Sequence, residues 1–112
     1  MAQSVEERRI QLHEELIDIL GTANQAESRV YYQPPESVKM SYPAIVYERD
    51  GGSSIRADNG VYKFKMKYTV TVVDPDPDSD IAIKILKHFC YSRIGTRYIA
   101  DNLNHDIVEI YY

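Results

Sequence analysis

The chain has 112 residues, 44% of them hydrophobic and 27% charged, which is the composition of one soluble globular domain and not of a disordered segment. Its formal net charge is −4, so the tight duplex binding that basic side chains drive is not expected, and its single cysteine, Cys90, excludes an internal disulfide and a cysteine-rich zinc module. No apolar run approaches the roughly 20 residues of a membrane span, and the first residues lack the apolar region of a secretory signal, so we expect neither.

The first predicted element is a helix over 4–20. It opens with a capping box, in which the side chains of Ser4 and Glu7 each bond the other residue's backbone N–H. One helical stripe of apolar residues follows, formed by Val5, Leu12, Leu16, Ile19 and Leu20. Ile10 and Ile17 either broaden this apolar face or form a second patch for a partner.

Two short strands are predicted next, near 29–33 and 43–49. Both are rich in β-branched and aromatic residues, and Pro34-Pro35 ends the first because proline cannot donate to a sheet. The segment 50–60 is polar and is bounded by the turn signals DGG and NG. We expect this segment to form either a long loop or a protruding hairpin.

A long strand is predicted over 61–73, because apolar and polar side chains alternate there. One face carries Tyr62, Phe64, Met66, Tyr68, Val70 and Val72. The other face carries Lys63, Lys65, Lys67, Thr69 and Thr71. We expect the apolar face to pack against the helices and the lysines to point away. At about 3.4 Å per residue the strand spans on the order of 40 Å, so it can extend past the body of the domain.

The DPDPDSD run that follows breaks this strand, and Asp78, Ser79 or Asp80 can cap a helix predicted over 79–89. A short strand near 96–100, a turn at Asp101-Asn102 and a last strand over 104–112 complete the chain. The expected fold is α+β, a single domain over 1–112. In it an antiparallel or mixed sheet of about four to five strands is covered by the two helices as a two-layer sandwich.

Asp74, Asp76 and Asp78 have the spacing of the first three ligands of an EF-hand calcium loop. Such a loop also needs a glycine at its sixth position and a bidentate acid at its twelfth, where this chain has Ser79 and Ile85. We therefore interpret the run as a strand-to-helix turn with a capping acid.

His88 and Cys90 are a residue pair used in nucleophilic catalysis, but such a site also needs an orienting third group. The structural interpretation is a histidine near a helix end and a cysteine that serves as a small buried hydrophobe. His13, His88 and His105 have no metal-ligand spacing. We expect no catalytic residue, no cofactor and no metal.

Lys63, Lys65 and Lys67 form the one basic patch of the sequence. Like charges along a strand face repel one another, so this lysine stripe needs solvent or acids beside it. Three interpretations are open, in descending order of weight: a solvated outer face, contact with an acidic surface of a neighbouring subunit, and contact with nucleic acid.

Three stretches together resemble the tail-completion proteins of long-tailed bacteriophages, also called tail terminators or neck proteins. They are VYYQPPESVKMSYPAIVY over 30–47, KYTVTVVDPDPDS over 67–79, and YIADNLNH over 98–105 with the Tyr111-Tyr112 end. The resemblance extends over residues 29–112 and includes no catalytic motif.

This resemblance implies a ring, six-membered as in the family, that caps the head-proximal end of the tail tube and joins the tail to the neck. The implied partners are further copies of the chain, the tail tube protein and the neck or head-completion protein, with no membrane and with genomic DNA passing through the lumen without sequence-specific binding. The chain would reside in the virion, and in the host cytoplasm during assembly. The alternatives are a head-completion or stopper ring of the same neck, a small adaptor or regulatory binding domain and, least favoured, an enzyme.

For the contact between subunits we expect the segment 50–60 and the long strand after it. The residues proposed for it are Asp50, Ser53, Ile55, Arg56, Asp58, Lys63, Lys65 and Lys67. The lysines would meet acids on the first helix of the adjacent subunit, where the candidates are Glu6, Glu14, Glu15 and Asp18. A closed ring needs two different surfaces on each subunit, and this hypothesis supplies both.

Overall fold

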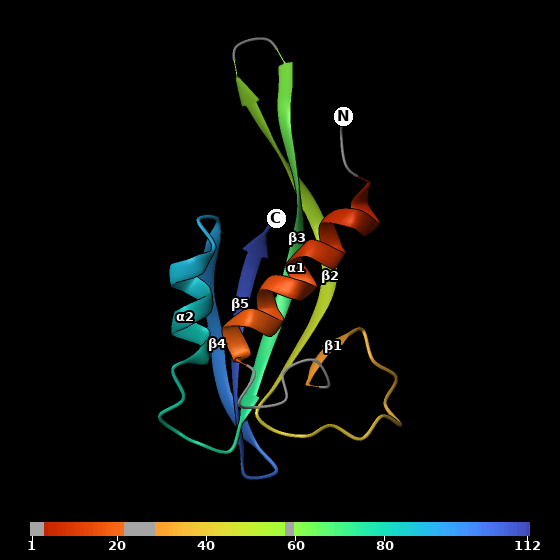
Figure 1. The fold of residues 1–112 in the computed structure, drawn as a ribbon. Helices are drawn as coiled ribbons and strands as arrows, with labels where there is room; N and C mark the ends of the chain where they lie inside the picture. The colour runs from red at the N-terminus through yellow and green to blue at the C-terminus, as the bar shows by residue number, and fades with distance from the viewer. Residues whose placement is uncertain (1–3, 22–28, 58–59) are drawn as a thin grey trace.

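The computed structural model describes residues 4–21, 29–57 and 60–112, and for 52–57 and 60–64 it describes the backbone alone. Within these residues two helices and five strands follow one another along the chain (Figure 1). In chain order they are α1 Val5–Leu20, β1 Val30–Tyr32, β2 Ala44–Ala57, β3 Gly60–Asp74, α2 Ile81–His88, β4 Ser92–Ala100 and β5 Leu103–Tyr111. The predicted α+β class is confirmed.

The strands form one mixed sheet in the order β1-β2-β3-β5-β4. β1 runs parallel to β2, and the other neighbouring pairs are antiparallel. β2 and β3 are the longest, with 14 and 15 residues, and they form the hairpin that rises beyond the body of the sheet (Figure 1). Of the two expectations for the segment 50–60, the hairpin is therefore confirmed, except at 58–59, which lie outside the described residues.

α1 begins at the capping box predicted for it. The Ser4 hydroxyl accepts from the Glu7 backbone N–H at 3.1 Å, and the Glu7 carboxylate accepts from the Ser4 N–H at 3.3 Å. These bonds satisfy N–H groups that a helix start otherwise leaves unpaired. At the other end, Gly21 donates its N–H to the Ile17 carbonyl at 3.0 Å with φ at +91°, a backbone conformation that suits glycine.

Both helices pack on the same face of the sheet and share one core with it (Figure 1). The largest fully buried side chains are Tyr47, Tyr68, Leu12, Leu16, Ile45, Ile85, Ile110, Val70, Val72 and Val108. The inward face predicted for the long strand is confirmed over 66–72, while the side chains of Tyr62 and Phe64 lie outside the described part. Ile17 packs against the core and so broadens the apolar face of α1, whereas Ile10 stays 42% exposed.

Tyr47 joins α1 to the sheet through its ring and its hydroxyl. The ring centroid lies 4.9 Å from that of Tyr32 and 6.1 Å from that of Tyr68. The hydroxyl lies 2.6 Å from His13 Nδ1 and accepts from Arg9 at 3.4 Å. Burial is the main cause that lowers the pKa of His13 and raises the pKa of Tyr47. Both shifts favour a neutral imidazole, whose Nδ1 accepts a hydrogen bond from the Tyr47 hydroxyl.

The passage from α2 to β4 differs from the sequence prediction. α2 is shorter than the predicted 79–89, and β4 is longer than the predicted 96–100. β4 begins at Ser92, whose hydroxyl donates to the Phe89 carbonyl at 2.8 Å and so turns the chain directly from helix into strand. No strand is predicted over 92–95 because Gly95 has low strand propensity and no alternating pattern precedes it.

Two turns flank β4. The predicted turn at Asp101-Asn102 is confirmed, with φ at +53° and +62°, the left-handed backbone that Asp and Asn tolerate in a two-residue hairpin turn.

Cys90 lies in the turn before β4 and is exposed, so its interpretation as a buried hydrophobe is wrong. Cys90 follows Phe89, the buried C-cap of α2, and lies on the surface because the chain there leaves the helix.

Candidate assembly surfaces

The hairpin of β2 and β3 is the most projecting feature of the described chain. The pairing of the two strands continues out to Ala57 and Gly60, whereas β5 pairs with β3 only over Lys67–Asp74. The outer part of the hairpin is thus paired within itself, and the molecule measures 50 × 25 × 24 Å. Gly51, with φ at +112°, lies in a bulge at the hairpin base, where the register of the two strands shifts.

The residues proposed for the contact between subunits lie partly on this hairpin. The structure places the backbone of Ser53, Ile55, Arg56 and Lys63 on the paired strands. Their side chains, and Asp58 as a whole, lie outside the described residues. Their part in an interface stays a prediction.

On the face of the sheet that carries no helix, four charged side chains alternate in sign across four neighbouring strands. A carboxylate oxygen of Asp50 on β2 lies 3.6 Å from Nζ of Lys67 on β3. The same Nζ lies 3.5 Å from Glu109 on β5, and Glu109 accepts from the guanidinium of Arg93 on β4. We call these four residues the charge ladder. It connects the base of the hairpin to the edge strand of the sheet.

Three residues of the charge ladder, Lys67, Arg93 and Glu109, have pKa values shifted in the direction that keeps them charged. The hydrogen bond from Arg93 is the largest cause that lowers the pKa of Glu109, and the charge of Lys67 adds to it. Glu109 is in turn the main cause that raises the pKa of Lys67, with a smaller contribution from Asp50. The hydrogen bond to Glu109 also raises the pKa of Arg93.

This ladder changes the interpretation of the lysine stripe. The side chain of Lys67 is only 25% exposed and is balanced by acids of its own chain, so a solvated outer face does not hold for it. Lys65 Nζ lies 4.9 Å from the ring centroid of Tyr91, a cation–π distance. Sequence reasoning missed Glu109 and Arg93 because the register between β3, β5 and β4 depends on pairings between segments far apart in the chain.

The acids proposed on α1 divide into two groups. Glu14 and Asp18 are exposed on the outer side of the helix. Glu15 is used inside the chain: its carboxylate lies 2.9 Å from His88 Nε2 on α2 and accepts from the Tyr112 hydroxyl. Burial, together with this bond, raises the pKa of Tyr112 to about 12. Glu15 therefore fastens α1 to α2 and to the end of β5.

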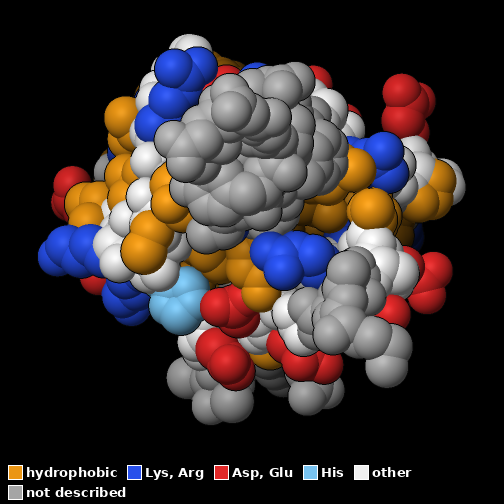
Figure 2. Space-filling view, turned by 90° about the horizontal axis from the view of Figure 1, so that it is seen from above, with side chains coloured by type: hydrophobic (Ala, Val, Ile, Leu, Met, Phe, Trp, Pro, Cys, Tyr) orange, Lys and Arg blue, Asp and Glu red, His pale blue; other side chains and the backbone are white. Residues whose placement is uncertain are grey.

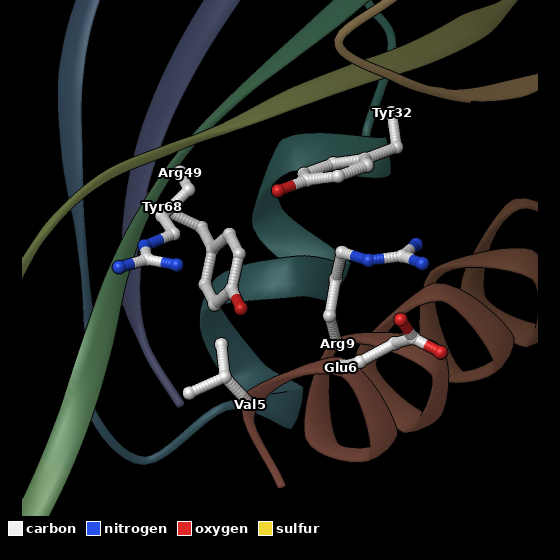
Figure 3. Close-up of a pocket in the computed structure, with 6 residues that line it drawn as sticks. All are labelled: Val5, Glu6, Arg9, Tyr32, Arg49 and Tyr68. Atoms are coloured by element: carbon white, nitrogen blue, oxygen red, sulfur yellow. The ribbon is translucent and has the colours of Figure 1, made fainter.

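A pocket of about 400 Å³ opens between the first turns of α1 and the sheet (Figure 3). Its lining consists of Val5, Glu6, Arg9, Tyr32, Arg49 and Tyr68. The guanidinium of Arg9 lies 4.3 Å from the ring centroid of Tyr32. Two guanidiniums, two phenols and one carboxylate give this pocket the means to hold a polar side chain by hydrogen bonds. Sequence reasoning did not identify it, because its members come from α1, β1, β2 and β3.

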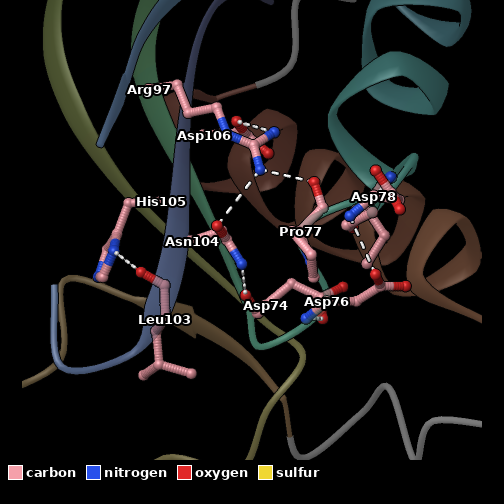
Figure 4. A network of polar contacts seen from close by, with 11 residues as sticks. Asp74, Asp76, Pro77, Asp78, Arg97, Leu103, Asn104, His105 and Asp106 are labelled. Carbon is pink, nitrogen blue, oxygen red and sulfur yellow. Dashed lines mark hydrogen bonds and ion pairs between the residues drawn. The ribbon is translucent and has the colours of Figure 1, made fainter. Parts of the chain in front are cut away.

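The aspartate run after β3 forms the turns predicted for it (Figure 4). Asp74 Oδ1 accepts from the Asp76 N–H at 2.8 Å, and Asp76 Oδ1 accepts from the Asp78 N–H at 2.9 Å. Of the three residues predicted to cap α2, Ser79 accepts from the Ile81 N–H through its hydroxyl at 3.5 Å. Asp80 precedes α2 without a side-chain cap bond, so the expectation of a capping acid is wrong. Carboxylates that bond the chain two residues ahead are committed to the turn and not to the helix.

Arg97 on β4 holds this turn against the sheet. Its guanidinium donates to the Pro77 carbonyl at 2.7 Å and lies 3.4 Å from a carboxylate oxygen of Asp106 (Figure 4). Asn104 accepts from the same guanidinium at 3.3 Å and donates to the Asp74 carbonyl at 3.1 Å. The network joins the turn, β4 and β5: Asn104 and Asp106 are buried, whereas the side chain of Arg97 is 45% exposed.

No group of three or more His, Cys, Asp and Glu side chains in the described ranges is placed to hold a metal ion. Likewise, neither α1 nor α2 nor any other described helical stretch is long and apolar enough to span a membrane. No protein-family model matches the chain. No curated protein matches it either.

Proposed function

We propose that this chain is the subunit of a ring in the virion of a tailed bacteriophage, of the tail-terminator type, which caps the tail tube and joins the tail to the neck. The three stretches that resemble tail-completion proteins are the origin of the proposal, and the projecting β2–β3 hairpin is the observation that carries it. A two-stranded hairpin is marginally stable by itself in water. Its outer half therefore finds its lasting contacts on a neighbouring subunit or an adjacent ring.

Two further features support a structural role. The sheet face without helices carries the charge ladder, so the hairpin base is held at a defined angle to the sheet by side chains on four strands. The net charge of −4 suits a lumen through which DNA passes without its phosphates being gripped.

The experiment deletes Gly51–Asn59, closes the gap with a short turn, and places the variant gene in the phage that encodes the chain. We expect a folded subunit, because the core lies below the bulge, and particles with tails of uncontrolled length or tails unjoined to heads. The wild-type gene supplied in trans is the control and restores normal particles. Infectious particles with normal tails from the deletion variant alone would contradict the role of the hairpin. Immunogold labelling of this chain in virions tests its position. Label beside the portal, and not at the end of the tail tube, would identify a stopper ring instead.

A further inference from the structure

We infer that the contact between adjacent copies joins the β4 edge of one chain to the outer side of α1 of the next. The β4 edge surface consists of Ile83, Lys87, Ile94 and Ile99, beside Arg97, which is paired with Asp106 of its own chain. The α1 outer surface consists of Ile10, Glu14 and Asp18. This inference rests on the proposed ring, and it replaces the lysine stripe, whose Lys67 is balanced within its own chain, as the basic partner of the α1 acids.

The β4 edge surface gathers large apolar side chains that the chain leaves uncovered. Ile83, Ile94 and Ile99 are 50%, 60% and 72% exposed. Ile94 is paired with Val108 and Ile99 with Asn104, whose side chains are buried on the face that carries α2, so both isoleucines point to that face. Single exposed apolar residues are ordinary, but three isoleucines on one flank mark an interaction site.

Ile83 turns toward the same flank. His88 of α2 contacts Glu15 of α1 at 2.9 Å, so that side of α2 faces α1. At 3.6 residues per turn, Ile83 lies about 140° around α2 from His88, on the side away from α1. In Figure 2 the flank of α2 and β4, at the left, carries hydrophobic and basic side chains together.

The β4 edge is unsuited to pairing with another strand. β4 ends the strand order, so one of its sides has no strand beside it among the described elements. A register shift interrupts it between Ile94 and Arg97, and such bulges, like basic side chains, discourage the addition of a strand. A two-fold contact of this edge with itself would also bring Lys87 near the same basic flank of the other copy. The occupant is therefore a surface that carries acids.

The outer side of α1 has that complementary character. Glu14 and Asp18 are exposed there, and Ile10 lies beside them with 42% of its surface exposed. Acidic side chains gather along the lower edge of Figure 2, which is the α1 side of the molecule. Two acids and an isoleucine would thus meet the exposed Lys87 and three isoleucines. A contact between two different surfaces is heterologous, and it closes into a ring when the rotation between copies allows.

Sedimentation velocity of the full chain over a range of concentrations tests the inference with two variants. The edge variant carries Ile94→Asp and Ile99→Asp, and the helix variant carries Glu14→Gln and Asp18→Asn, so that the two altered surfaces do not attract each other. We expect the wild type to associate beyond a dimer, and each variant alone to remain monomeric, with its dissociation constant raised about tenfold or more. An equimolar mixture is expected to form dimers and stop, because each mixed pair keeps a single intact contact. Tyr98→Asp, on the opposite face of β4, is the matched control and should associate like the wild type.

A monomeric wild type, an edge variant that associates like the wild type, or a mixture without dimers would overturn the inference. Thermal unfolding of each variant separates loss of the contact from loss of the fold, and Lys87→Glu, on the exposed side of α2, replaces the edge variant if that one does not fold. If virions made with the edge variant still contain the ring, the proposed contact is contradicted and the proposed function is supported. If the variants sediment as expected but virions contain no copy of the chain, the proposed contact is supported and the proposed function is contradicted.

Discussion

Lys67 and Glu109 face each other from β3 and β5, with 3.5 Å between Nζ and the nearer carboxylate oxygen. Glu109 is bonded from its other side by Arg93, and Lys67 reaches Asp50 on β2. Lys67 in the middle of the sheet thus links β2 to β5 and, through Glu109, to β4.

Replacing Arg93 with Gln is expected to raise the pKa of Glu109 toward its ordinary value, because the Arg93 hydrogen bond is the largest cause of its lowering. Lys67→Gln, the matched change on the other side, should raise that pKa by less. A carboxyl whose pKa is lower in the folded than in the unfolded chain stabilises the fold above the unfolded pKa, and this contribution is lost as the pH falls through the folded value. Carbon-detected NMR titration of the Glu109 carboxyl measures this pKa in the wild type and in both variants. An unchanged Glu109 titration in Arg93→Gln would refute the ladder.

Leu16→Ala is expected to lower the free energy of unfolding by about 2–5 kcal/mol, because it empties a fully buried site between α1 and the sheet. Gln11→Ala, on the exposed side of the same helix, should change it by less than about 0.5 kcal/mol. Urea unfolding of the two variants measures the difference. Equal losses would mean that α1 packs through another face.

Arg97→Ala is expected to cost about 1–3 kcal/mol, because it removes the cation beside the Asp106 carboxylate, whose side chain is only 7% exposed. The matched variant Arg97→Ala with Asp106→Asn should lose less than the sum of the two single changes. Thermal and urea unfolding of the wild type, the two single variants and the double variant complete this double-mutant cycle. Strict additivity would show that the two side chains do not interact.

Tyr112 is expected to ionise near pH 12, and Glu15→Gln should lower this pKa only in part, because burial is the larger cause and remains. A tyrosine whose folded pKa is raised stabilises the fold fully below its unfolded pKa, and the contribution is lost as the pH rises through the folded value. NMR of the labelled ring carbon beside the hydroxyl follows the titration. A Tyr112 that ionises near its ordinary pH in the wild type would contradict the contact between β5 and α1.

Features with a local physical cause were predictable from the sequence. The capping box of Ser4 and Glu7 began α1 as expected, the alternation over 66–72 identified the inward face of β3, and Asp101-Asn102 made its turn. In each case the deciding interactions lie within a few residues of chain or follow from a period of two or 3.6 residues.

The charge ladder, the pocket at α1 and the length of β4 were not predictable in the same way. Asp50, Lys67 and Glu109 are brought together only by the register between three strands, and no short stretch of sequence specifies that register. β4 gains its length from pairing with β5, which overrides the weak strand propensity around Gly95.

The most direct test of the central claim is cryo-electron microscopy of virions from the phage that encodes this chain. The account predicts one ring of six copies at the head-proximal end of the tail, with each hairpin against a neighbouring subunit or ring. Virions that contain no copy of the chain, or that hold it away from the junction of tail and neck, would contradict it.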